Sequence, residues 1–148
     1  MIDQLRETDG RVLTVLLVED NASDVALTQE ALTELDVLTR LTVAADGAAA
    51  LALLDGRCQP DLVLLDLNLP AGDGLEVLDA IRRSPQARTR SLPVIVLTTS
   101  RASTDIQRAY DRGASAFVTK PLSIDEFFDA VRVFSDFWLR VAELPRPA

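Results

Sequence analysis

The chain has 148 residues, of which 48% are hydrophobic, which is enough for one compact domain with a substantial core and too few for a second. Its 23 acidic residues outnumber its 15 basic ones, and the formal net charge of -8 argues against direct nucleic-acid binding, because a phosphate backbone would be repelled over most of the surface. The absence of histidine and the presence of one cysteine exclude histidine-based triads, histidine-ligated metals and an internal disulfide.

The sequence contains no apolar run of about 18 residues, and residues 1–10 are mostly charged and polar. We therefore expect neither a membrane-spanning helix nor a signal peptide, and predict a cytoplasmic protein without membrane contact. Residues 1–11 are expected to be a flexible N-terminal segment. Residues 12–142 should form the folded domain, including an extended last helix, and residues 143–148 a loose tail.

Five short apolar segments are typical of buried parallel strands. They cover residues 12–18 and 38–45, the run that ends at Asp66, and residues 93–98 and 115–118. Apolar residues at helical spacing follow each strand, between recognisable start and stop signals. These signals are Asn21 or Ser23 as the first cap, Asp46-Gly47 and Gly56 around the second helix, residues 75–83 for the third, Gly113 ending the fourth, and Ser123 starting the last.

The arginine-rich residues 84–92 are expected to be a loop. Five strands alternating with five helices predict an α/β fold with a doubly wound, five-stranded parallel sheet.

Polar side chains stand at the ends of four of these strands. They are Glu19 and Asp20 after the first strand, Asp66 after the third, Thr98 after the fourth and Lys120 after the fifth. A solvated loop that begins where a strand stops would explain any one of them. A doubly wound sheet, however, brings these ends to one edge, where proteins of this class bind their ligands. We therefore expect all five side chains to lie together.

Three clustered carboxylates repel one another unless a cation lies among them, and Mg²⁺ prefers oxygen ligands. Because Mg²⁺ often shares its coordination shell with phosphate oxygens, the cluster predicts phosphoryl transfer, with Asp66 as the nucleophile that becomes an acyl phosphate. Lys120 and Thr98 would then each contact a phosphate oxygen.

Taken together, these motifs resemble the receiver domains of bacterial two-component response regulators. The similarity covers about residues 12–133. It rests on Val18-Glu19-Asp20-Asn21, Leu64 to Pro70 with Asp73-Gly74, Thr98-Thr99-Ser100 and Thr119-Lys120-Pro121. It implies a flavodoxin-like fold and a phosphoacceptor, rather than an enzyme, whose Asp66 accepts a phosphoryl group from the phosphohistidine of a sensor histidine kinase.

The resemblance also implies the metal ligands. Asp20, Asp66 and the backbone carbonyl of Asn68 would bind Mg²⁺, or Mn²⁺ in its place. Glu19 would act mostly through water, because its side chain is longer than the aspartate found more often at this position.

A switch is implied as well. Thr98 would move toward the phosphate, which Lys120 contacts, and Phe117 would rotate inward with it. The peptide bond corresponding to Lys120–Pro121 is commonly cis in the family. Within the family, the chain looks most like stand-alone regulators that partner bacterial phytochromes, so a phytochrome-type kinase is the expected partner.

Three other functions compete with this interpretation. An aspartyl-nucleophile phosphatase of the haloacid dehalogenase type needs a second aspartate two positions after the nucleophile, where this chain has Asn68. A nucleotide- or flavin-binding module would need a glycine-rich loop after the first strand, where Glu19 and Asp20 would repel phosphate. A scaffold that works without phosphorylation remains open if Glu19 weakens cation binding.

The last helix carries about twice the apolar surface that one sheet face covers. One stripe comprises Ile124, Phe127, Phe128, Val131, Phe134 and Trp138, and an adjoining stripe comprises Ala130, Val133, Phe137 and Val141. Either the helix kinks near Phe134 and folds back on its own domain, or the chain forms a homodimer through its fourth helix, fifth strand and fifth helix. The expected dimer contacts are Val133, Phe137, Trp138 and Val141, with Arg108 and Arg112 in ion pairs unless they are simply solvated.

Overall fold

Five parallel strands form one sheet whose order brings the polar strand ends side by side. The structure is a computed structural model that describes residues 12–56, 58–69 and 72–145. The strands are β1 (Leu13–Val18), β2 (Thr39–Ala44), β3 (Leu62–Leu65), β6 (Val94–Thr98) and β7 (Ala116–Thr119). They are hydrogen-bonded in the order β2-β1-β3-β6-β7, and each pair is parallel. This order confirms the predicted flavodoxin-like, doubly wound sheet.

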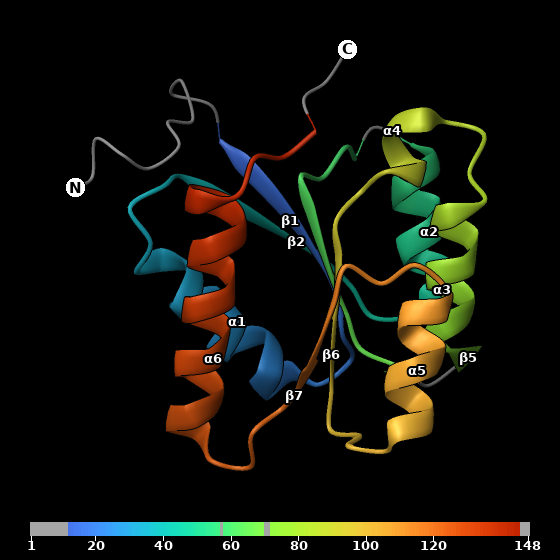
Figure 1. Cartoon of the computed structure of the whole chain (residues 1–148). Helices are drawn as coiled ribbons and strands as arrows, with labels where there is room; N and C mark the ends of the chain where they lie inside the picture. The colour runs from blue at the N-terminus through green and yellow to red at the C-terminus, as the bar shows by residue number, and fades with distance from the viewer. Residues whose placement is uncertain (1–11, 57, 70–71, 146–148) are drawn as a thin grey trace.

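Helices cover both faces of the sheet. They are α1 (Ala22–Thr33), α2 (Gly47–Asp55), α3 (Gly74–Arg82), α5 (Ser103–Asp111) and α6 (Ile124–Asp136). Figure 1 shows α1 and α6 on one face and α2, α3 and α5 on the other. The side chains of Asn21, Asp46 and Ser123 cap α1, α2 and α6, and Gly113 follows α5 with a positive φ of 97°. The predicted starts of these three helices and the predicted end of α5 are therefore confirmed.

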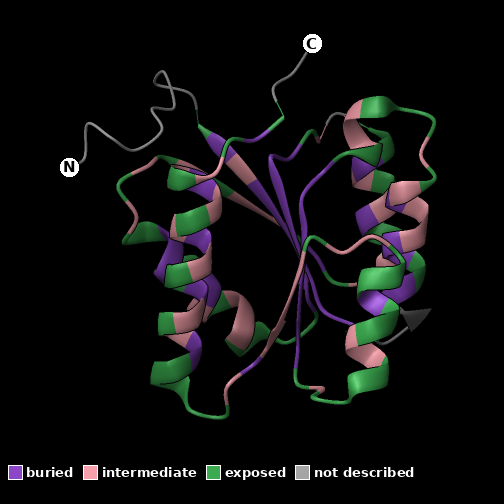
Figure 2. Cartoon of the chain, in the orientation of Figure 1, coloured by how far each residue is buried: buried purple, intermediate pink, exposed green. Residues whose placement is uncertain are grey.

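The core lies on both sides of the central strands. Every residue of β3 and β6 is buried, as expected for strands covered on both faces, whereas the edge strands β2 and β7 are mostly half-buried. In Figure 2 the buried positions follow the central strands and the inward sides of the helices. In the described residues, none of the helices is both long enough and apolar enough to span a lipid bilayer.

Two short elements were not predicted. Directly after β3, the strands β4 (Asn68–Leu69) and β5 (Gly72–Asp73) form an antiparallel ribbon. Within the expected loop of residues 84–92, α4 (Ala87–Arg90) makes one helical turn. The predicted loop is wrong at this point because arginine side chains hold the segment: Arg82 donates to the carbonyls of Arg90 and Leu92, at 3.0 and 2.7 Å.

The end of the last helix departs most from the sequence pattern. After α6 the chain continues as a π-helical turn, η2 (Phe137–Val141), closed by a 2.7 Å hydrogen bond from the Ala142 amide to the Phe137 carbonyl. The chain then returns over the sheet, so that Leu139 and Leu144 are buried in the core on the α1–α6 face. Leu144 belongs to the segment expected to be a loose tail, yet it packs on the domain. The expected flexible residues 1–11 and residues 146–148 lie outside the described residues.

Candidate functional site

Backbone hydrogen bonds fix the first residue beyond each of three strands. The Glu19 amide donates to the Ala44 carbonyl at 2.9 Å, and the Asp66 amide donates to the Val18 carbonyl at 3.1 Å. The Lys120 amide donates to the Thr98 carbonyl at 2.7 Å. Sheet hydrogen bonding therefore extends one residue past the strands and holds these side chains at the carboxyl edge, which lies at the bottom of Figure 1.

The three predicted carboxylates meet at this edge. Glu19, Asp20 and Asp66 each contribute an oxygen atom that lies within 4.8 Å of the other two. Glu19 and Asp66 are buried, whereas Asp20 is exposed. The cluster borders a cavity of about 400 Å³, lined by Glu19, Asp20, Asn21, Asp24, Asp66, Asn68, Thr99 and Lys120. This is a donor set of oxygen atoms that suits a hard divalent cation.

Lys120 lies in the middle of the acidic groups. Its Nζ atom is 2.6 Å from Glu19 Oε2, 2.9 Å from Asp24 Oδ2 and 3.3 Å from Asp66 Oδ2. Burial by itself would lower the pKa of Lys120, but the hydrogen bonds to Glu19 and Asp24 and the charge of Asp66 outweigh burial and raise the pKa above its usual value. The lysine is therefore a permanent cation beside Asp66.

Glu19 responds to the same cluster in a different way. Burial raises its pKa, and the negative charge of Asp66 adds to the rise, while the hydrogen bond and the charge of Lys120 oppose it. Nearby positive charge therefore favours the ionised form of Glu19, as expected for a carboxylate at a cation site.

Thr98 is completely buried and is linked to Asp66 through Asn68. The Asn68 side-chain amide donates to Thr98 Oγ1 at 3.1 Å, and its backbone amide donates to Asp66 Oδ1 at 3.1 Å. Only the backbone carbonyl of Asn68 was predicted to belong to the site. The side-chain contact depends on the short ribbon of β4 and β5, which no sequence signal had indicated.

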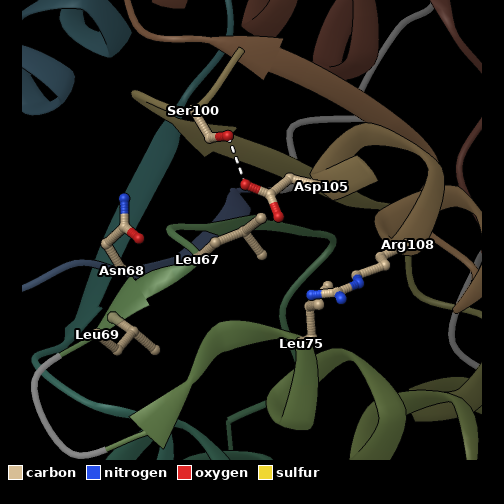
Figure 3. Close-up of a pocket in the computed structure, with 7 residues that line it drawn as sticks. All are labelled: Leu67, Asn68, Leu69, Leu75, Ser100, Asp105 and Arg108. Carbon is tan, nitrogen blue, oxygen red and sulfur yellow. Dashed lines mark hydrogen bonds between the residues drawn. The ribbon is translucent and has the colours of Figure 1, made fainter. Parts of the chain in front are cut away.

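A second cavity, of about 310 Å³, adjoins the first and shares Asn68 with it (Figure 3). Ser100 donates a hydrogen bond to Asp105 at 2.5 Å across one side of this cavity. Arg108 extends from α5 toward Leu75 on α3. Arg108, predicted for a dimer surface, therefore lines a cavity of its own chain.

The remaining predicted residues are also placed. Phe117 is half-buried against the core on the α2–α3 face, and its amide donates to the Tyr110 hydroxyl at 3.2 Å. Arg112 forms an ion pair with Asp79 on α3 at 3.3 Å. The described residues contain no cis peptide bond, so Lys120–Pro121 is trans and the expected cis form is wrong here, in keeping with the intrinsic preference of X–Pro bonds for trans.

Asp24 is the site residue that the sequence analysis missed. It occupies the third position of α1, where acidic residues are common because they favour the helix dipole, so its type did not stand out. Its spacing from Asp20 gave no signal either, because Asp20 precedes the N-cap Asn21 and lies outside the helix.

Comparisons with known proteins agree with this geometry. The sequence matches the model of the response regulator receiver domain family over residues 15–132. It is 37% identical over 137 residues to the response regulator Rcp1 of Synechocystis, covering 88% of this chain and 92% of that protein. It is 41% identical over 139 residues to the probable methanogenesis regulatory protein FilR2 of Methanothrix harundinacea, covering 90% and 88%.

Two solved structures are similar throughout. The phosphorylated cyanobacterial phytochrome response regulator RcpA superimposes with a TM-score of 0.86 at 38% identity, covering 92% of this chain and 100% of that one. The Mn(2+)-bound form of Rcp1 superimposes with a TM-score of 0.85 at 37% identity, covering 90% and 99%.

Proposed function

Because the chain belongs to the response regulator receiver domain family, we propose that Asp66 is its phosphoacceptor and that it receives a phosphoryl group from the phosphohistidine of a sensor histidine kinase. The observation that supports this most directly is the convergence of the carboxylates of Glu19, Asp20 and Asp66, two of which, Glu19 and Asp66, also contact the ammonium group of Lys120. In the reaction an Asp66 oxygen attacks phosphorus, the phosphorus–nitrogen bond breaks, and its electron pair stays on the imidazole.

Each side chain of the site has a physical task in this reaction. Lys120 is charged and 3.3 Å from Asp66, so it can neutralise an oxygen of the arriving phosphoryl group. The Asn68 amide donates to one Asp66 oxygen and keeps that carboxylate oriented. Thr98 supplies the nearby hydroxyl, and release from the Asn68 side chain would let it reach the phosphoryl group.

The donor set fits Mg²⁺, with Mn²⁺ able to replace it. Asp20 and Asp66 would hold the ion with the Asn68 backbone carbonyl, and Glu19 would contribute through water. The similar structure of Rcp1 was solved in its Mn(2+)-bound form. When bound, the cation neutralises negative charge on the carboxylates and on the transferred group.

We further propose that the donor is a phytochrome-type histidine kinase and that the exchange takes place in the cytoplasm. The similarity to RcpA, described as a phytochrome response regulator, supports the first point. The chain would act as a phosphoacceptor in the relay, and hydrolysis of its own acyl phosphate would be its only turnover.

Labelling by a small phosphodonor tests the site directly. Purified protein incubated with phosphoramidate and Mg²⁺ should gain the mass of one phosphoryl group in intact mass spectrometry, and EDTA should prevent the gain. Asp66→Asn should abolish labelling because the nucleophile is gone. Asp55→Asn, which removes an exposed carboxylate at the end of α2, should label like the wild type.

Labelling of Asp66→Asn at the wild-type rate would move the nucleophile elsewhere, and an unlabelled wild type would overturn the proposal. A phosphorylated phytochrome kinase should then transfer to the wild type faster than an unrelated histidine kinase does.

We also propose a homodimer through the face formed by α5, β7 and α6. Val133, Phe137 and Val141 lie four residues apart and are 59%, 51% and 47% exposed, so they form one apolar row along the last helix. Trp138, expected in the same contact, is half-buried in its own core and meets the Phe137 ring edge-on at 5.6 Å. Trp138 would therefore pack against Phe137 on the core side of the interface. Two copies of the exposed row could pack against each other around a two-fold axis.

A further inference from the structure

Asp24 contacts the lysine of the site without belonging to the carboxylate cluster. Its Oδ2 atom is 2.9 Å from Lys120 Nζ, closer than the Asp66 oxygen at 3.3 Å. The group of oxygens within 4.8 Å of one another, searched over the described residues, comprises Glu19, Asp20 and Asp66, and Asp24 is not among them. Within the described part of the chain, its ion pair is with Lys120.

The backbone of Asp24 is held from both sides. Its amide donates to the Asn21 side chain at 3.0 Å, and its carbonyl accepts a hydrogen bond from the Thr28 hydroxyl at 2.8 Å. The first turn of α1 therefore cannot shift easily, and the side chain reaches the cavity from a fixed position. The hydrogen bonds at the start of α1 therefore position Asp24 for its contact with Lys120.

An ammonium group has three hydrogen-bond donors, and here all three have acceptors. For Lys120 to donate to an oxygen of a phosphoryl group on Asp66, one present acceptor must give up its bond. Asp66 carries the phosphoryl group, and Glu19 belongs to the cation cluster. Asp24 is thus the acceptor that continues to compete for the lysine.

We propose that Asp24 is a positioning residue that holds Lys120 back from the phosphoryl group and so slows phosphorylation of Asp66. This inference rests on the phosphoacceptor function proposed above. The Asp24 side chain is about a quarter exposed, and a partly exposed ion pair has a modest strength. Removing its charge should accelerate labelling about threefold to fivefold.

The test compares labelling rates with phosphoramidate and Mg²⁺, each followed to completion by intact mass spectrometry so that slow variants are measurable. Asp24→Asn should label faster than the wild type, and Asp24→Glu, which keeps the charge, should restore a slow rate. Glu30→Gln removes one exposed charge from the same helix and should leave the rate unchanged. Asp24→Ser gives a second neutral variant, and thermal melting checks that each protein is folded.

A Lys120→Gln background separates the lysine from simple repulsion of an anionic donor. If Asp24 acts through Lys120, Asp24→Asn should have no effect in this background, as in a double-mutant cycle. An equal acceleration in both backgrounds, or an unchanged or slower rate of Asp24→Asn in the wild-type background, would overturn the inference while labelling at Asp66 still stands. A wild type that does not label at all would overturn the proposed function and this inference with it.

Discussion

The carboxyl edge of the sheet and the end of the last helix are built in opposite ways. At the edge, Glu19, Asp66 and Lys120 each follow a strand whose apolar run is plain in the sequence, and backbone hydrogen bonds fix their positions. At the helix end, a change from α-helical to π-helical geometry between Phe137 and Val141 determines which residues are buried. A site built on strand ends therefore follows from local sequence pattern, whereas a helix end depends on long-range packing.

The largest change in stability should come from a substitution on the buried side of the helix end. Leu139 is fully buried, so Leu139→Ala should lower the free energy of unfolding by about 2–5 kcal/mol, because it removes apolar contacts and leaves a cavity. Val141→Ala, on the exposed side of the same turn, should cost no more than about 0.5 kcal/mol. Urea denaturation at low protein concentration measures both. Equal costs for the two variants would contradict the role of this turn as part of the core.

The exposed side of the same turn should matter for association instead. Phe137→Ala should weaken the proposed dimer by about 2 kcal/mol, or roughly thirtyfold in Kd, because aromatic side chains dominate such contacts. Sedimentation or light scattering over a concentration series measures this, with Leu38→Ala as a control that removes an exposed apolar side chain before β2. A wild type that stays monomeric at tens of micromolar would remove the dimer from consideration.

The sequence predicted the sheet and most of the site for the same reason. Strand segments are short and apolar, and a doubly wound order brings Asp66 and Lys120 to one edge whatever the loops do. Asp24 was not predicted as a site residue because an acidic residue in the first turn of a helix is common, so only its contact with Lys120 reveals its place in the site. The hydrogen bond from the Asn68 side chain to Thr98 was not predicted because it depends on the ribbon of β4 and β5.

The burial of Leu139 at the helix end was not predicted, for a geometric reason. In an ideal α-helix, Leu139 would lie about 120° around the axis from Phe127, outside the stripe that faces the sheet. The π-helical turn has more residues per turn, so it rotates Leu139 back toward the core. The excess apolar surface itself does not fold back: Leu139 and Leu144, which belong to neither predicted stripe, are buried on the domain, whereas Val133, Phe137 and Val141 of the second stripe stay exposed.

The smallest change in the free energy of unfolding should come from replacing Ser135, and this change should be stabilising. Ser135 is fully buried between Val131 and Leu139 along the helix, and its hydroxyl has no hydrogen-bond partner among the residues that the structure describes. Ser135→Ala should therefore raise the free energy of unfolding by about 0.5–1 kcal/mol, because it removes an unpaired buried polar group and introduces a better helix former.

Ser123→Ala in the same helix provides the matched control. There the hydroxyl caps the helix by accepting from the Glu126 amide at 3.3 Å, so its loss should cost about 1 kcal/mol. Thermal and urea unfolding of the two variants measure a pair of opposite shifts that arise from the same chemical change. A destabilised Ser135→Ala would mean that the buried hydroxyl has a partner, such as an ordered water, and that this side of the helix end is less apolar than the packing of Leu139 indicates.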